Sequence, residues 1–326
     1  MSKSILGLHH VTAIAGDPQQ NINFYTGFLG LRMVKFTVNY DDPGTYHLYF
    51  GDEAGHPGTI LTFFPWPGAP KGRRGTGQVT TVSFAVPEGS LDYWVDRLKS
   101  AGIDYDGPID RFEEEAISFP DPDGLQLELV THPGIRAGSP WQGGPVPLDK
   151  AIQGFYGITV SEEGYERTAG LLTATLGFKP TRESGNKFRY EVGEGGSGAI
   201  VDVECLPSWQ RGIVAVGTVH HVAWRTHTDE EQQMWRDEIA GLGYNVTPII
   251  NRWYFHSIYF REPGGVLFEI ATDPPGFAID EPADQLGTHL VLPPWLEPRR
   301  VQIEHVLPQV KLSERLKKVR DESRAA

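Results

Sequence analysis

The sequence is short of cysteine and of basic residues. Its one cysteine, Cys205, excludes an internal disulfide framework and a cysteine-rich zinc or iron–sulfur site. Lys and Arg total 29 against 42 Asp and Glu, a net charge of −13, so no cationic surface for nucleic acid or an anionic membrane is expected. No apolar run reaches about 18 residues, and the first residues, MSKSILGLHH, lack a signal-peptide core. We therefore expect a cytoplasmic protein without membrane association.

Glycine and proline, in contrast, are plentiful, with 38 and 25 residues. Both residue types favour turns over long helices, so the sequence indicates many short strands. A length of 326 residues exceeds what a single hydrophobic core usually supports and therefore predicts two domains.

The chain contains an internal repeat. The segment GQVTTV at 77–82 matches GTVHHV at 217–222, an offset of 140 residues (217 − 77). After one inserted residue the offset becomes 141 (235 − 94), and it then matches Trp94 with Trp235, Phe119 with Phe260 and Glu128 with Glu269. A fainter match at offset 147 (176 − 29) joins 29–31 to 176–178. We therefore divide the chain into four related modules: 5–66, 77–133, 152–207 and 216–274.

Each module combines one helix with short strands. In module 1, apolar and β-branched runs predict strands over 8–15, 32–39, 46–51 and 59–64. Asp17-Pro18 predicts the start of a helix, with Asp17 as its N-cap. Module 4 repeats this order, with a helix over about 229–240 and strands over 219–225, 254–260 and 266–271. The order βαβββ, four times over, predicts an α+β fold.

Two adjacent histidine pairs, His9-His10 and His220-His221, lie on the first strands of modules 1 and 4. By composition, the 11 histidines of this chain would form about 0.4 such pairs by chance. Because a strand alternates its faces, we expect only one histidine of each pair to point at a given interior. Alternation alone leaves open which one.

Glu269 lies in an apolar strand of module 4, at the place that Glu128 takes in module 2. A carboxylate that faces inward on such a strand is costly unless it is paired, hydrogen-bonded or bound to a metal. Module 2 has Thr80-Thr81 where module 4 has its histidines. The duplication therefore leaves a complete set of histidines and glutamate in module 4 and a stripped set, the glutamate without histidines, in module 2. Two imidazoles and one carboxylate with open positions suit non-haem Fe(II), with Mn(II) as the second choice.

The repeated βαβββ unit, with its ligands on first and last strands, resembles the vicinal oxygen chelate superfamily of glyoxalases, extradiol dioxygenases and bleomycin-resistance proteins. The closer resemblance is to the ring-cleaving hydroquinone dioxygenases. The segments that carry it are LGLHHVT, LGLRMVKFTVNYDDPGTYHLYFGDEAGHPGTILTFFPW, GTVHHVAW and GGVLFEIATDPPGF. The resemblance implies four βαβββ modules paired into two domains, each an open barrel-like mixed sheet with helices outside. We place the domains at 1–135 (modules 1 and 2) and 151–275 (modules 3 and 4), the linker at 136–150 and a C-terminal extension at 276–326.

The resemblance also implies a function: an Fe(II)-dependent, extradiol-type dioxygenase that opens hydroquinone or its substituted and chlorinated forms with O2. It places the iron ligands on His10, His221 and Glu269, in a barrel shared by modules 1 and 4. It gives catalytic roles to His220 and Tyr259 in proton transfer or hydrogen bonding and to Arg252 in holding anionic species. It gives supporting roles beside the substrate to His9 and Thr12. The remaining histidines, His47 among them, have no ligand spacing.

Three alternatives stay open. A glyoxalase-like lyase or isomerase with Zn or Ni would need a fourth protein ligand, which modules 2 and 3 do not offer. A catechol dioxygenase would take its ligands from the C-terminal domain, where Gly157 replaces the histidine of module 3. A metal-free binding protein for an aromatic or drug molecule would leave the two histidines and Glu269 unexplained. The expected partners are a small aromatic diol and O2, and the sequence leaves open whether the chain forms a homo-oligomer.

Overall fold

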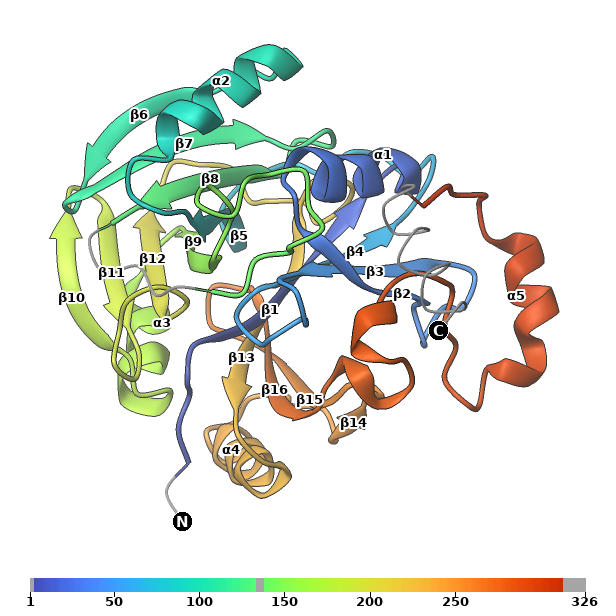
Figure 1. Cartoon of the computed structure of the whole chain (residues 1–326). Coiled ribbons are helices and arrows are strands. Elements are labelled where there is room, and N and C mark those ends of the chain that lie inside the picture. Colours follow the sequence, from blue (N-terminus) through green and yellow to red (C-terminus); the bar gives the residue numbers. More distant parts are fainter. Residues whose placement is uncertain (1–2, 133–137, 313–326) are drawn as a thin grey trace.

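A computed structural model describes residues 3–132 and 138–312 and contains two eight-stranded mixed sheets (Figure 1). The first sheet consists of β1 (Leu8–Ala15), β2 (Arg32–Val38), β3 (Tyr46–Gly51), β4 (Ile60–Pro65), β13 (Val219–Thr226), β14 (Ile250–Asn251), β15 (Phe255–Arg261) and β16 (Leu267–Pro275). Its strand order is β14-β15-β16-β13-β1-β4-β3-β2. The first and last modules of the chain therefore share one sheet, joined by the antiparallel pair β1 and β13.

The second sheet is built in the same way from modules 2 and 3. Its strands are β5 (Gln78–Ala85), β6 (Asp106–Arg111), β7 (Glu114–Pro120), β8 (Gln126–Thr131), β9 (Gly154–Glu162), β10 (Lys179–Ser184), β11 (Lys187–Glu191) and β12 (Ile200–Cys205). They follow the order β10-β11-β12-β9-β5-β8-β7-β6. The sheets thus pair module 1 with module 4 and module 2 with module 3. The domain limits at 1–135 and 151–275 stay a prediction.

The helices are few and lie outside the sheets (Figure 1). They are α1 (Pro18–Ile22), which continues as a π-helical turn (Asn23–Phe28), α2 (Leu91–Ala101), α3 (Glu166–Gly170), continued by Leu171–Thr175, α4 (Asp229–Gly241) and α5 (Arg300–Val306). Asp17 caps α1 by accepting a hydrogen bond from Gln20 N, as the sequence predicts. The predicted α+β class is therefore confirmed. None of the described helices is both long and apolar enough to cross a membrane.

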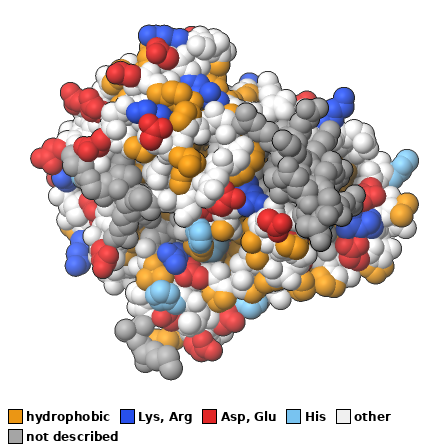
Figure 2. Space-filling model, in the orientation of Figure 1, with side chains coloured by type: hydrophobic (Ala, Val, Ile, Leu, Met, Phe, Trp, Pro, Cys, Tyr) orange, Lys and Arg blue, Asp and Glu red, His pale blue; other side chains and the backbone are white. Residues whose placement is uncertain are grey.

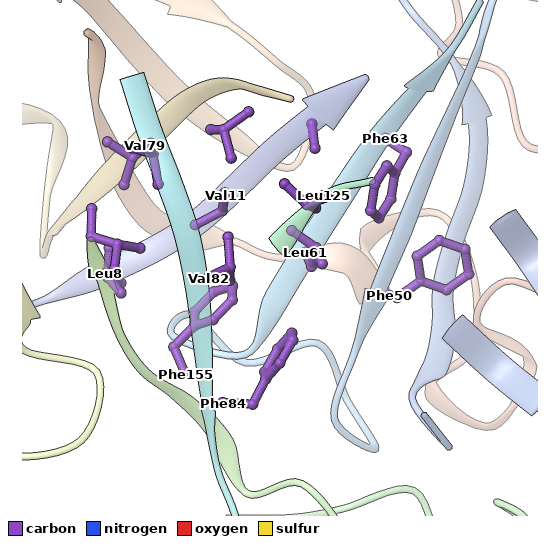
Figure 3. Close-up of a cluster of buried hydrophobic side chains, with 14 of the residues drawn as sticks. Leu8, Val11, Phe50, Leu61, Phe63, Val79, Val82, Phe84, Leu125 and Phe155 are labelled. Atoms are coloured by element: carbon purple, nitrogen blue, oxygen red, sulfur yellow. The ribbon is translucent and has the colours of Figure 1, made fainter. Parts of the chain in front are cut away.

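A shared apolar core joins the two sheets. Figure 3 shows Val11 of β1 and Leu61 of β4 in one cluster with Val82 of β5 and Phe155 of β9. All four side chains are at most 2% exposed. Because strands alternate their faces, Val11 in this core turns its neighbour His10 toward the opposite, concave face of the first sheet. The core thereby fixes which side chains face the cavity described below.

The segment after β16 covers one arm of the first sheet. Val291 N donates to Phe36 O of β2, and Leu292 and Leu296 are buried. Residues 136 and 137 of the predicted linker and 313–326 of the predicted extension lie outside the described residues. On the face drawn in Figure 2, acidic and basic side chains are interspersed.

A buried carboxyl pair links the two sheets at one end. Glu162, the last residue of β9, and Glu262, which follows β15, are both 2% exposed. Burial and the neighbouring Glu262 raise the pKa of Glu162 from 4.5 to about 8. The folded chain therefore holds a proton that the unfolded chain releases between these two values, so the free energy of unfolding falls as the pH rises through this range.

Replacing Glu162 with glutamine is expected to remove this pH dependence. Between pH 5 and pH 8 the parent should lose about 3 kcal/mol of its free energy of unfolding through this group, a loss that the variant should not show. Urea unfolding at both pH values measures this. The exposed neighbour is the control: Glu163→Gln should leave the pH profile unchanged. An unchanged profile in Glu162→Gln would show that the carboxyl pair stores no proton.

Candidate metal centre

Three buried side chains converge on the concave face of the first sheet. His10 comes from β1, His221 from β13 and Glu269 from β16, three adjacent strands. The two Nε2 atoms lie 3.4 Å apart, and Glu269 Oε2 lies 3.0 Å from that of His221 and 3.3 Å from that of His10. Donor atoms about 2.1 Å from one ion in neighbouring positions are themselves about 3 Å apart. The triangle therefore has the dimensions of one face of a metal's coordination sphere.

Two β-bulges bring both members of each histidine pair to this site. In the β1–β13 ladder, Leu8 faces Trp224 and His10 faces Ala223, so His9 has no partner. Further along, His220 is skipped on β13 in the same way. A bulge inserts one residue and interrupts the alternation of faces. The expectation that only one histidine of each pair faces the interior is therefore wrong for His220 and His221, which both line the cavity described below, whereas of the first pair only His10 lines it.

The first histidine of each pair contacts the second one. His9 Nδ1 lies 2.9 Å from His10 Nδ1, and His220 Nδ1 lies 2.8 Å from His221 Nδ1. Because the Nδ1 atoms of His10 and His221 are engaged in this way, their Nε2 atoms are the ones free to face Glu269. Such a contact fixes the tautomer and the ring orientation of a metal-binding histidine.

The protonation states at the triangle suit a cation. Burial lowers the pKa of His221, so its imidazole is neutral and offers a lone pair. Burial alone would raise the pKa of Glu269, but His10 and His221 outweigh it and hold that pKa well below its ordinary value. Neutral imidazoles and an ionised carboxylate are the forms that bind metals.

Within the described part of the chain, no Lys or Arg side chain pairs with Glu269. Ser257 Oγ donates to its Oε1, whereas its Oε2 accepts no hydrogen bond of normal geometry, although the side chain is fully buried. A buried carboxylate without a counter-charge is strongly destabilising. The two imidazoles and this orphaned oxygen therefore fit a divalent ion. Among the described residues, they form the one group of at least three His, Cys, Asp or Glu side chains close enough to hold a metal.

The equivalent place in the second sheet is closed. There, Arg111 donates to both oxygens of Glu128, with Nη1 2.8 Å from Oε1, and Ser83 donates to Oε2. Gly157 faces Ile200 as His10 faces Ile60, and a Cβ on Gly157 would lie 2.9 Å from the Ile200 side chain. The stripped set predicted for module 2 therefore carries a guanidinium at the corresponding glutamate.

A cavity of about 260 Å³ opens beside the three donor atoms. Its walls hold aromatic side chains, among them Phe64, Trp66 and Phe255. Pockets for drug-sized ligands begin at about 300 Å³, so this cavity suits a molecule of about one ring. The cavity also exposes His10, His221, His220, Arg252 and Tyr259.

Arg252 bridges the interior of the cavity and its rim. Its Nε donates to the Tyr259 hydroxyl at 3.2 Å, and its Nη1 donates to Asp41 Oδ2 at 2.8 Å. Burial opposes the charged form, but Tyr259 and Asp41 raise the pKa of Arg252, so it stays a cation. Burial also raises the pKa of the Tyr259 hydroxyl, which stays protonated. Burial lowers the pKa of His220 to about 3, so its imidazole is neutral.

The other two residues with an expected supporting role lie behind the cavity wall. His9 contacts His10 and packs against Phe255, with ring centroids 5.0 Å apart. Thr12 Oγ1 lies 2.8 Å from Thr62 Oγ1 on the neighbouring strand β4. Neither His9 nor Thr12 lines the cavity itself. Their contacts are therefore with the residues that form its wall.

Sequence reasoning missed His47 and Tyr49 of β3, which both line the cavity. His47 Nδ1 lies 2.9 Å from the Tyr49 hydroxyl, and its Nε2 lies 2.8 Å from Thr62 Oγ1. Their spacing of two residues on a predicted strand was the available signal, since such residues share one face. Metal-ligand spacing was the wrong criterion for His47, because it lies beside the ligands without being one.

Comparison with known proteins identifies the family. The model of the Glyoxalase/Bleomycin resistance protein/Dioxygenase superfamily matches residues 7–129 and 158–270. The protein named "Putative ring-cleaving dioxygenase MhqO" of Bacillus subtilis (strain 168) is 50% identical over 307 residues, 94% of this chain and 97% of the relative. The chlorohydroquinone/hydroquinone 1,2-dioxygenase of Sphingobium indicum is 35% identical over 303 residues, 91% of this chain and 94% of the relative.

Solved structures agree with this match. The crystal structure of a "putative dioxygenase" from Bacillus subtilis superimposes with a TM-score of 0.91 at 48% identity and covers 96% of this chain and 99% of its own. Glyoxalase I from Zea mays, with a TM-score of 0.60 and 16% identity over 83% of this chain and 93% of its own, shares the fold alone. The chain therefore belongs to the glyoxalase/bleomycin resistance protein/dioxygenase superfamily, and its relatives there include proteins named ring-cleaving dioxygenases.

Proposed function

We propose that this protein is an Fe(II)-dependent ring-cleaving dioxygenase that opens hydroquinone-type diols, including substituted or chlorinated ones, with O2. The observation that carries the proposal is the buried triangle of His10, His221 and Glu269 at the wall of an aromatic cavity. The name of the Sphingobium indicum relative, a chlorohydroquinone/hydroquinone 1,2-dioxygenase, supports the same substrate class.

Two imidazoles and one carboxylate on one face suit iron, with manganese as the second choice. When bound, Fe(II) would hold the diol and dioxygen side by side and pass electrons from one to the other. The protein would leave the remaining coordination positions of the metal free for the substrate and dioxygen. Gly157 and Thr81, the other first-strand positions that a four-ligand lyase could use, lie in the second sheet. This arrangement favours the dioxygenase over the glyoxalase-like lyase.

The residues around the cavity suit chemistry on a phenolic ring. Tyr259 keeps its proton and can donate a hydrogen bond to an oxygen atom of the reacting substrate. Arg252 stays charged and can hold the carboxylate of a ring-opened product. The neutral imidazole of His220 lines the cavity and can accept a proton from a substrate hydroxyl.

The position of the hydroxyl groups defines the cleaved bond. The two hydroxyls of a hydroquinone are para to each other, so only one of them can reach the triangle. We infer that the bond broken joins the carbon of this hydroxyl to its unsubstituted or chlorinated neighbour, which is cleavage of the extradiol type. A cavity of about 260 Å³ holds one such ring.

Oxygen uptake tests the proposal. The protein is purified without oxygen, loaded with Fe(II) and supplied with hydroquinone or catechol. Hydroquinone should consume one O2 per ring and lose its aromatic absorbance, at least about tenfold faster than catechol, whose ortho hydroxyls cannot span the cavity in the same way. Mn(II)-loaded protein, assayed in parallel, identifies the better metal.

Other outcomes have definite meanings. Faster uptake with catechol would assign the protein to catechol cleavage. No uptake with either diol despite stoichiometric metal would overturn the dioxygenase and direct the next assay to thiol–aldehyde adducts, the substrates of a lyase. Absence of bound metal in protein that still binds aromatic molecules would favour the metal-free binding protein. A cytoplasmic location and the lack of nucleic-acid partners stay predictions from the sequence, which leaves the oligomeric state open.

A further inference from the structure

The first sheet contains a second, metal-free counterpart of the half-site around Glu269. On β16, Glu269 faces Tyr259 of the antiparallel strand β15. On β4, Thr62 faces Tyr49 of the antiparallel strand β3. The two strand pairs flank β13 and β1 in the same order, so Thr62 takes the place of Glu269 and Tyr49 that of Tyr259.

The register confirms this equivalence. Val222 faces Phe268, so continuing this parallel register places His221 beside Leu267, two residues before Glu269. His10 faces Ile60, two residues before Thr62. A metal ligand on β4 equivalent to Glu269 would therefore have to come from Thr62.

Thr62 is not available as a ligand, because its hydroxyl lies in a chain of hydrogen bonds. Thr12 Oγ1 and His47 Nε2 each lie 2.8 Å from Thr62 Oγ1, and the chain continues from His47 Nδ1 to the Tyr49 hydroxyl. All the side chains in this series of hydrogen bonds are uncharged when buried. The counterpart of the acidic half-site is thus a neutral wall that can donate or accept hydrogen bonds.

We propose, on the basis of the proposed function, that Tyr49 and His47 bind the hydroxyl of the para-diol that does not reach the metal. Both side chains line the cavity, and they lie on the arm of the sheet opposite Glu269. A hydroxyl buried without a partner costs several kcal/mol in an apolar wall, so a para-diol needs a polar group at this end.

The pair of His47 and Tyr49 suits a substrate hydroxyl because it can act either as a hydrogen-bond donor or as an acceptor. With the proton on His47 Nδ1, the imidazole donates to the Tyr49 oxygen, and the Tyr49 hydrogen is free to point at the substrate. With the proton on Nε2, Tyr49 donates to His47, and its oxygen can accept from the substrate. Burial lowers the pKa of His47 well below its ordinary value, so the imidazole stays neutral in both arrangements.

Of the other polar side chains that line the cavity, Asp41, Arg252 and Tyr259 engage one another, whereas the Tyr40 hydroxyl has no hydrogen-bond partner among the described residues. Arg252 is paired with Asp41 at the rim and with Tyr259 on the metal side. The side chains of Phe64 and Trp66 contain no oxygen atom that could accept a hydrogen bond from the second hydroxyl of the substrate. Tyr49 and His47 are therefore positioned to distinguish a para-diol from a phenol that carries an apolar group at the same place.

Equilibrium binding under argon tests the inference. Hydroquinone and 4-methylphenol, in which a methyl group replaces the second hydroxyl, are titrated into Fe(II)-loaded protein. The parent protein should bind hydroquinone about tenfold more tightly, and Tyr49→Phe should abolish this preference without loss of iron. Tyr46→Phe is the matched control, because Tyr46 lies on the same strand but donates to Pro308 O outside the cavity.

Two results would overturn the inference: a parent protein without preference for hydroquinone, or a Tyr49→Phe variant that keeps it. If Tyr49→Phe does not fold, His47→Phe decides, since it retains a ring but removes both hydrogen bonds and should abolish the preference as well. Failure of the proposed function is distinct, because the parent would then show no oxygen uptake with hydroquinone at all.

Discussion

Replacing Glu269 with glutamine is expected to remove most of the bound metal and to lower ring-cleaving turnover at least about 100-fold. Glu269 Oε2 is the anionic corner of the triangle, and an amide is a far weaker ligand for a divalent ion. The variant should remain folded, because the amide oxygen can still accept the hydrogen bond from Ser257 Oγ. It also removes a buried negative charge, which is costly without a cation.

Metal content, oxygen uptake and thermal unfolding of Glu269→Gln are measured together. The second sheet supplies the control: Glu128 has the equivalent position, but Arg111 and Ser83 are its partners there. Glu128→Gln should therefore keep the metal and the turnover. Full metal and full turnover in Glu269→Gln would show that the triangle is not the metal site.

The second large effect is expected at the histidine pair of β1. His10→Ala should lose nearly all metal, because its Nε2 is a corner of the triangle, 3.3 Å from Glu269 Oε2. His9→Ala should keep bound metal but with an affinity reduced about 10- to 100-fold, since His9 orients the His10 ring through their 2.9 Å Nδ1 contact.

Titration of both variants with a metal indicator, in competition with a chelator, gives the two affinities. The pair on β13 offers an independent repeat, with His221→Ala expected to lose more metal than His220→Ala. Equal affinities in His9→Ala and the parent would mean that the bulge has no role in orienting the ligand. A larger loss in His9→Ala than in His10→Ala would mean that His9 is the ligand.

The two sheets share a duplicated backbone but surround their equivalent glutamates with different charges. In the second sheet, bulges occur at Thr80 and Tyr156, the positions that correspond to His220 and His9. The backbone of the site is thus retained there without its ligands. A guanidinium at Glu128 supplies the positive charge that, under the proposed function, a metal ion supplies at Glu269. The bulges therefore belong to the fold, whereas the candidate metal site also needs the side chains of His10, His221 and Glu269.

Much of the fold follows from local features of the sequence. The repeat offsets gave four modules because duplicated segments retain turn glycines and core aromatics at fixed spacing. Strands such as β1 and β3 have the predicted limits, since apolar runs between turn residues are a local signal. The repeat also marked the two histidine pairs and Glu269 as candidate ligands, and the family resemblance then selected His10 and His221 from the pairs.

The sequence by itself thus determined the α+β modules and the candidate ligands. Only the tertiary structure decided three further points: the register in which modules 1 and 4 pair in one sheet, that bulges bring the two rings of each histidine pair into contact, and that His47 and Tyr49 line the cavity. Each depends on register and contacts between segments far apart in the chain, and strand periodicity carries no information about either. The same separation explains why Glu128 and Glu269 look alike in sequence, although one contacts an arginine and the other two histidines.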